Sequence, residues 1–137
     1  MRPFALLAVL ALAAGCTSYP TLAKTGTVKV RPENGRVLSP APAGGKATVY
    51  VDVVNNGGAD DTLLGVMSEV AGRAELRSRD GTIDHIVIPA ATMVPLASED
   101  RHIQLYDLKR ELREGDVIIV TLLLQKSGAI GAITVVK

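Results

Sequence analysis

The stretch at residues 46–66, KATVYVDVVNNGGADDTLLGV, decides the fold class of this chain. Its first half alternates with a period of two, and one of its faces is apolar throughout: Ala47, Val49, Val51 and Val53. This pattern is typical of a β-strand that lies with one face on a core. The NNGG cluster at 55–58 tolerates positive φ angles and therefore predicts a sharp turn, after which a second strand begins at Thr62.

The rest of the chain consists of similar short segments. They are alternating or apolar runs separated by Gly, Pro, Asp and Ser, and none outside the first 16 residues has a helical period of useful length. Besides the strand just described, strands are expected at 28–30, 36–38, 62–69, 74–79, 82–88, 94–96, 101–106, 117–125 and 129–136. Many short strands at regular spacing indicate an all-β sandwich or barrel.

Three of these segments carry more detailed predictions. A turn at 32–35 is expected to separate the first two strands. Residues 82–88 follow an Asp80-Gly81 turn and are expected to return as one strand of a hairpin. Residues 117–124 are apolar on both faces, as expected of a central strand that is covered on both sides.

The composition is that of one globular domain. Of the 137 residues, 47% are hydrophobic and 21% are charged, whereas aromatic residues make up 3% and Trp is absent. The core must therefore be built from Val, Leu, Ile and Ala.

The first 16 residues, MRPFALLAVLALAAGC, have the features of an export signal. Arg2 precedes an apolar run at 4–14, which is shorter than the roughly 20 residues of a membrane-spanning helix. The AAGC sequence that ends at Cys16 resembles a bacterial lipobox, although the expected Leu stands one place early, at Leu12. The alternative is an ordinary cleaved signal peptide with an incidental Cys.

These features predict a lipid-anchored protein of the bacterial cell envelope. Residues 1–15 are the expected lipoprotein signal peptide, Cys16 the lipidated residue, 16–27 a lipid-attached tether and 28–137 the folded domain, facing the extracytoplasmic side. Cys16 is the one Cys of the chain, so the fold has no internal disulfide. Without residues 1–15, 14 basic and 14 acidic side chains remain, a balance that gives no support for nucleic-acid binding.

Several motifs of the domain resemble those of periplasmic copper chaperones of the PCu(A)C type. Tyr50, the NNG at 55–57, Asp61 and the LLG at 63–65 are similar to the Y…N-x-G…D-x-L-x-G signature of that family. Residues 86–90 resemble its I-x-I-P-A segment, and residues 108–116 its L-K-x-x-L-x-E-G-D turn. The resemblance implies a cupredoxin-like Greek-key β-sandwich over most of residues 28–137.

The same resemblance implies a metal site at one end of the sandwich. In the family, two His and two Met hold Cu(I), a soft ion that suits imidazole and thioether ligands. In this chain the Glu75-Leu76 dipeptide is followed by Arg77 where the family has His, and residues 83–85 replace the Met-containing loop. His102 matches the His of the His-x-Met pair, but Gln104 stands in place of Met.

The substituted positions are poor copper ligands. Arg77 has no lone pair to donate and stays charged, and Gln104 offers only a hard amide oxygen. His102 and His85 are therefore the candidate metal ligands, with Met93 or Asp84 as an auxiliary. Met67 and Met93 lie in apolar segments, where filling the core is the ordinary role of Met.

Two functions follow as hypotheses. The first is a copper-handling lipoprotein that accepts Cu(I) and passes it to a partner such as the CuA centre of cytochrome c oxidase. The second is a metal-free binding or assembly module on the same fold, with a basic patch at the old site that is either open to an acidic partner or balanced by nearby acids: Arg77, Arg79, Arg101 and His102, with Asp80, Glu99 and Asp100.

Catalysis is disfavoured by the same residues. No Ser lies in a nucleophile-elbow pattern, and Asp84 and His85 would point to opposite faces of a strand. No catalytic residue is therefore assigned.

Overall fold

The computed structural model describes residues 28–137, and every regular element in this part of the chain is a β-strand. The predicted signal peptide, Cys16 and the predicted tether lie outside the described residues. The strands are β1 (Val30–Val37), β2 (Ala47–Asn55), β3 (Asp61–Met67), β4 (Ala71–Ser78), β5 (Gly81–Thr82), β6 (Ile86–Ile88), β7 (Thr92–Leu96), β8 (His102–Leu108), β9 (Val117–Leu124) and β10 (Gly128–Val136). The prediction of an all-β fold is confirmed.

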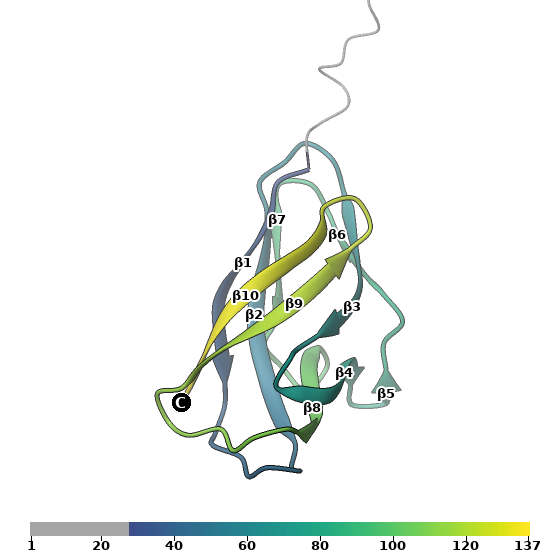
Figure 1. Cartoon of the computed structure of the whole chain (residues 1–137). Helices are drawn as coiled ribbons and strands as arrows, with labels where there is room; N and C mark the ends of the chain where they lie inside the picture. The colour runs from purple at the N-terminus through teal and green to yellow at the C-terminus, as the bar shows by residue number, and fades with distance from the viewer. Residues whose placement is uncertain (1–27) are drawn as a thin grey trace, which may run out of the picture.

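The strands form one curled sheet whose two layers enclose the core (Figure 1). Their order is β5-β4-β8-β2-β1-β10-β9-β3-β6, and β7 pairs with β2 beside this path. β1 and β10 pair in parallel, whereas the other pairs are antiparallel. Many neighbours are therefore not consecutive in the sequence, as expected of the predicted Greek-key sandwich.

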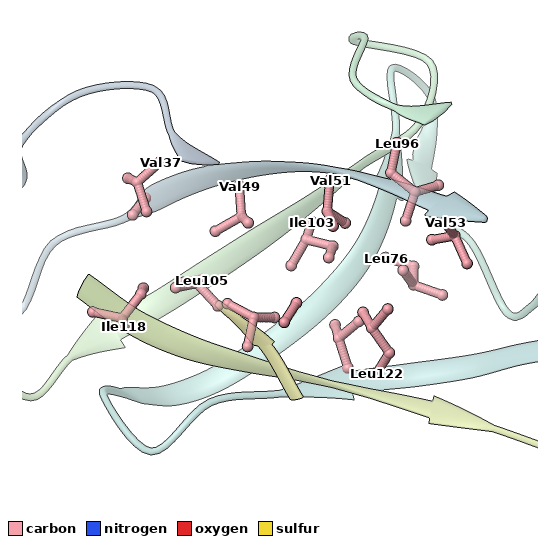
Figure 2. Packing of buried hydrophobic residues seen from close by; sticks show 14 of the residues in the cluster. Val37, Val49, Val51, Val53, Leu76, Leu96, Ile103, Leu105, Ile118 and Leu122 are labelled. Carbon is pink, nitrogen blue, oxygen red and sulfur yellow. The ribbon is translucent and has the colours of Figure 1, made fainter. Parts of the chain in front are cut away.

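β2 is the central strand, as its alternating sequence predicts. Its residues alternate strictly between buried and partly exposed positions, and Val49, Val51 and Val53 are completely buried. β2 pairs with β1 along one edge and with β7 and β8 along the other. Figure 2 shows its valines facing Ile118 and Leu122 of β9 across the core.

The core is aliphatic and lies wholly within residues 30–136. The largest side chains that are completely buried are Leu63, Ile88, Leu96, Ile103, Leu105, Leu112 and Leu122, with the valines at 37, 49, 51, 53 and 120. Burying side chains of this size contributes about 1.5–3 kcal/mol each. Because one contiguous cluster joins both layers, we expect residues 24–137 to fold independently.

The prediction of two strands around a turn at 32–35 is wrong. The chain forms the single strand β1, which contains an irregularity between Glu33 and Arg36 where its register with β2 shifts. A bulge contains Asn34 and Gly35, whereas Pro32 stays in register opposite Val53. Gly35 is required here, because a Cβ at this position would lie 2.5 Å from the carbonyl oxygen of Ile133 in β10.

The strand predicted at 82–88 is divided between two parts of the sheet. β5 pairs with β4, whereas β6 pairs with β3 at the other end of the strand order. Residues 83–85 connect β5 and β6, which lie at opposite ends of the strand order. The alternation of residues 82–88 in the sequence does not show this interruption.

The prediction that residues 117–124 are covered on both sides is also wrong. Ile118, Val120, Leu122 and Leu124 are buried, but Val117 and Ile119 on the other face are 57% and 58% exposed. In Figure 1, β9 and β10 lie at the front of the molecule with no other strand over them.

Candidate functional site

The pairing of β4 with β8 brings the positions predicted as metal ligands together. Arg77 lies directly opposite His102, and Glu75 lies directly opposite Gln104. Opposite residues of an antiparallel pair project from the same face of the sheet. Leu76 lies between Glu75 and Arg77 in the sequence and is buried, so these four residues project outward. We call Glu75, Arg77, His102 and Gln104 the polar row.

Each member of the polar row contacts neighbouring protein groups. Nη1 of Arg77 lies 3.2 Å from Oε2 of Glu75. The hydroxyl of Thr48 donates a hydrogen bond of 3.0 Å to Oε1 of Gln104. Nδ1 of His102 lies 3.1 Å from the carbonyl oxygen of Ser98. The amide oxygen of Gln104 is therefore already used within the protein.

This arrangement does not fit a copper ion. A guanidinium stands opposite the imidazole where the second His ligand is expected, and it carries the positive charge that a metal ion would bring. Within residues 28–137, no group of three or more His, Cys, Asp or Glu side chains is placed to hold a metal ion.

His85 lies in the exposed link between β5 and β6. Arg77 pairs with Thr82 of β5 on one side and with His102 of β8 on the other. Arg77 therefore stands between His102 and the segment that leads to His85, and Asp84 in that segment lines a shallow depression between β3 and β4.

The sequence favours core positions for Met67 and Met93, and this prediction is wrong. Met67 and Met93 are each 53% exposed. Met67 ends β3 at the turn into β4, whereas Arg77 lies near the far end of β4. Met93 lies in β7, opposite Val54 of β2. Neither β3 nor β7 contributes a residue to the polar row.

The predicted basic patch is a surface of mixed charge. Nη2 of Arg79 lies 3.0 Å from Oε2 of Glu99, and its Nε lies 3.4 Å from Oδ1 of Asp100. These ion pairs are exposed and contribute little to stability, but together with the pair of Arg77 and Glu75 they offset the positive charge.

Sequence reasoning missed Glu75 as the partner of Arg77, although a signal was present. The two residues are separated by one position, which in a strand places both on the same face. Arg73 contacts the same carboxylate, with its Nε 3.5 Å from Oε1. Arg73, Glu75 and Arg77 thus form an alternating series of charges along the outer face of β4.

The same outer face carries two tyrosines stacked with cations. The guanidinium of Arg73 lies 4.3 Å from the centre of the Tyr106 ring, and Nζ of Lys46 lies 5.5 Å from it. On the neighbouring strands, the guanidinium of Arg36 lies 5.4 Å from the ring of Tyr50. Such pairs hold long cationic side chains over rigid aromatic rings.

Two other signature residues of the resemblance, Asn55 and Asp61, lie elsewhere and have a structural role. The carboxylate of Asp61 is buried and accepts hydrogen bonds from the backbone N–H groups of Thr62, Lys126 and Ser127 and from the Ser127 hydroxyl. Asn55 is buried, donates to the carbonyls of Ala59 and Ile88, and accepts from the N–H of Gly57. We call Asn55 and Asp61 with these bonds the loop latch.

The loop latch also determines the ionisation of Asp61. Burial alone would raise the pKa of this carboxyl, but the hydrogen bonds from Ser127, Lys126 and Thr62 outweigh burial and lower the pKa below its usual value. Asp61 is therefore ionised in the folded protein and holds the turn between β9 and β10 against β3.

Solved structures with the same arrangement define the class of this domain. The copper-bound PCuAC domain from PmoF2 is 24% identical, with a TM-score of 0.70 over 81% of this chain and 95% of its own length. The apo PCuAC domain from PmoF1 is 23% identical, with a TM-score of 0.71 over 81% and 96%. CuI-DR1885 from Deinococcus radiodurans is 20% identical, with a TM-score of 0.61 over 90% and 83%. The chain thus has the PCuAC fold, and the predicted cupredoxin-like architecture is confirmed.

The chain belongs to the LpqE-like lipoprotein family, whose model matches residues 24–136. No curated protein matches it significantly. Within residues 28–137, no helix has the length and hydropathy needed to cross a lipid bilayer.

Proposed function

We propose that this protein is an envelope lipoprotein that uses a PCuAC fold as a binding module and works without copper. The observation that carries the proposal is Arg77, a fixed cation that faces His102 across β4 and β8 and is paired with Glu75. The ion pair of Arg77 with Glu75 occupies the expected metal position. The outer face around it, which carries the stacked pairs of Arg73 with Tyr106 and Arg36 with Tyr50 and which we call the binding face, recognises a partner through these polar and stacked side chains.

The composition of that face supports protein recognition. Tyr and Arg are the residue types most enriched at the energetic centres of protein interfaces, and both occur here as stacked pairs. Tyr106 with Arg73 and Tyr50 with Arg36 are directly opposite across neighbouring strands. Since each ring already restrains its cation, little side-chain freedom remains to be lost on binding.

The proposed lipid at Cys16 would attach the module to a membrane. The family is one of lipoproteins, and the AAGC sequence places the single Cys where a lipobox needs it. Residues 16–27 would then tether the domain to the outer side of a bacterial membrane, and the role is one of binding rather than catalysis.

A second candidate function is copper transfer, favoured by the likeness to the copper-bound PmoF2 domain and by the retained His102. In this alternative, His102 with His85 or a methionine would hold Cu(I), and the recipient would be a copper protein such as the CuA centre of cytochrome c oxidase. The ion is then cargo, and it would have to displace Arg77 from its position.

A Cu(I) competition titration of residues 24–137 under reducing conditions distinguishes the two functions. We expect the wild-type domain to leave the copper with a chelating probe, as the His102→Ala variant does. Stoichiometric binding by the wild type that is lost in His102→Ala would contradict the metal-free proposal and support copper transfer.

The binding face has its own test, which does not involve copper. The lipidated full chain, cross-linked in cell envelopes, is expected to capture a partner that Arg73→Ala with Tyr106→Ala does not capture. A suitable control is Arg113→Ala, which removes an exposed cation whose Nε is paired with Glu111 at 3.1 Å, away from β4. Equal capture by all three proteins would contradict the assignment of this face.

A further inference from the structure

The binding face carries an excess of positive charge. Its outward side chains at 46–50, 73–77 and 102–106, with that of residue 36, include four cations and one acid: Arg36, Lys46, Arg73, Arg77 and Glu75. The whole chain has a formal net charge of +1. Positive charge is therefore concentrated on one face of the domain rather than spread over its surface.

The strand register arranges these cations in two rows. Arg73 lies directly opposite Tyr106, and Lys46 approaches the same ring from the start of β2. Arg77 lies four residues further along β4, and Arg36 pairs with the residue of β2 that lies four residues beyond Lys46. The two rows are therefore about 13 Å apart along the strands, and they extend about 10–14 Å across them.

The acidic side chain of the binding face does not balance these cations. Arg73 and Arg77 share the carboxylate of Glu75. In the described part of the chain, neither Arg36 nor Lys46 forms an ion pair with an acid. Nη1 of Arg36 instead donates a hydrogen bond of 2.9 Å to a backbone carbonyl oxygen. Both rows therefore have positive charge that an anion from another molecule can balance.

Two further acids border the binding face, and neither forms an ion pair with its cations. Asp52 lies further along β2, and its carboxylate accepts a hydrogen bond of 3.0 Å from Asn34. A Cβ added at Gly72 would lie 3.1 Å from Cβ of Asp107, so these two positions share one side of the sheet. Since Gly72 precedes Arg73 in β4, the side chain of Asp107 leaves the sheet on the side opposite to that of Arg73.

We propose that the binding face recognises an acidic protein surface, whose Asp and Glu carboxylates pair with both rows of cations. The acidic partner is the partner of the proposed function, on which this assignment rests. The guanidinium of Arg73 lies over the Tyr106 ring, and the side chain of Arg73 is 59% exposed, so its remaining N–H groups are accessible to a carboxylate. Complementary charge also speeds the encounter of the two proteins.

An anionic membrane is a poorer occupant of the binding face. Lys46 precedes β2, whereas Asn55 at the other end of β2 pairs with Val30. The proposed tether would enter at Val30, about 30 Å along the strand from the row that contains Lys46. That row therefore lies at the end of the domain remote from the attachment point. Elements that lie on membranes also insert apolar side chains, whereas the outward side chains of both rows are polar or aromatic.

The test is fluorescence anisotropy with a labelled peptide of about ten L-glutamates as the acidic probe. We expect residues 24–137 to bind it with a dissociation constant below about 1 mM at about 50 mM NaCl, and about 10-fold more weakly at about 300 mM NaCl, because salt screens exposed charges. Arg36→Gln with Lys46→Gln should raise the constant about 10-fold. The matched control, Arg113→Gln with Lys126→Gln, removes the same charges from the segments on either side of β9 and should leave the constant within about twofold.

Two results of this titration would overturn the acidic partner. One is the absence of peptide binding at about 1 mM domain, and binding to vesicles of phosphatidylglycerol and phosphatidylcholine in its place would identify a membrane as the occupant. The other is an equal loss of peptide binding in both double variants. Thermal unfolding midpoints within a few degrees of the wild type establish that the variants are folded.

The cross-linking experiment in cell envelopes separates the acidic partner from the proposed function. Capture that is lost in Arg73→Ala with Tyr106→Ala, and also in Arg36→Gln with Lys46→Gln, is the expected result. Capture that is lost in the first variant but unchanged in the second would leave the binding face in place and overturn its acidic partner.

Discussion

The loop latch and the polar row are both built from polar side chains, but they differ in burial and in bonding. Asn55 and Asp61 are buried, and backbone groups of the surrounding loops satisfy them. The polar row lies on an outer face, and its members contact one another, the side chains of Arg73 and Thr48, and the carbonyl oxygen of Ser98. Asn55 and Asp61 of the motifs therefore maintain the fold, whereas the polar row is held only by contacts on the surface of the sheet.

The largest effect is expected from breaking the loop latch. Asp61→Ala leaves the N–H groups of Thr62, Lys126 and Ser127 without their acceptor in a buried place. We expect a loss of about 3 kcal/mol in the free energy of unfolding, measured by urea denaturation of residues 24–137. The neighbouring Asp60 is the control, because it is exposed and accepts one bond, from Ala90, so that Asp60→Ala should cost about 1 kcal/mol. Equal losses in both variants would contradict the special role of Asp61.

The polar row should accept a metal when its ligands are restored. Arg77→His combined with Gln104→Met places a second imidazole opposite His102 and a thioether two residues along β8. We expect the Cu(I) affinity to rise about 100-fold or more in the same competition titration, because the guanidinium charge is removed and two soft ligands are added. Adding His102→Ala to this variant should abolish the gain. No gain would mean that Arg77 is not what excludes copper.

The loop latch should also respond to acid. The folded-state pKa of Asp61 is below its unfolded value of about 3.9, so the stability that its ionisation contributes is fully present above about pH 4. That contribution is lost as the pH falls through the folded-state pKa. The difference in unfolding free energy between wild type and Asp61→Asn should therefore shrink between pH 7 and pH 3. A constant difference over this range would contradict the lowered pKa.

The smallest effect is expected from the ion pair of the polar row. Arg77 and Glu75 have side chains that are 32% and 22% exposed, and such pairs contribute about 0.5 kcal/mol. Arg77→Ala should therefore change the free energy of unfolding by no more than about this amount in the same urea experiment. A loss as large as that of Asp61→Ala would show that the polar row maintains the fold as well.

The sequence predicted the parts of the fold that local periodicity controls. β2 alternates in sequence and in burial alike, because one of its faces meets the core. Residues 117–124 gave no such guidance, since an apolar outer face looks the same in sequence whether another layer or solvent covers it. Residues 82–88 are divided into β5, which pairs with β4, and β6, which pairs with β3. This division depends on the curling of the sheet, which no local pattern encodes.

The candidate site could be predicted only in part for a similar reason. The family motifs located Arg77, His102 and Gln104, and the structure places them on one outer face. The contact of Arg77 with Glu75 was within reach of strand periodicity. The exposure of Met67 and Met93 was not, because an apolar neighbourhood in sequence does not tell which face of a strand a side chain occupies.

The parallel pairing of β1 with β10 makes the synthesis of β10 a condition for closing the fold. Gly35, Arg36 and Val37 pair with residues 134–136, a separation of about a hundred positions along the chain. A growing chain that ends before β10 leaves β1 and β9 without the strand that joins them. The domain should therefore stay open until β10 has been made, so the pairing of β1 with β10 is a late step of folding.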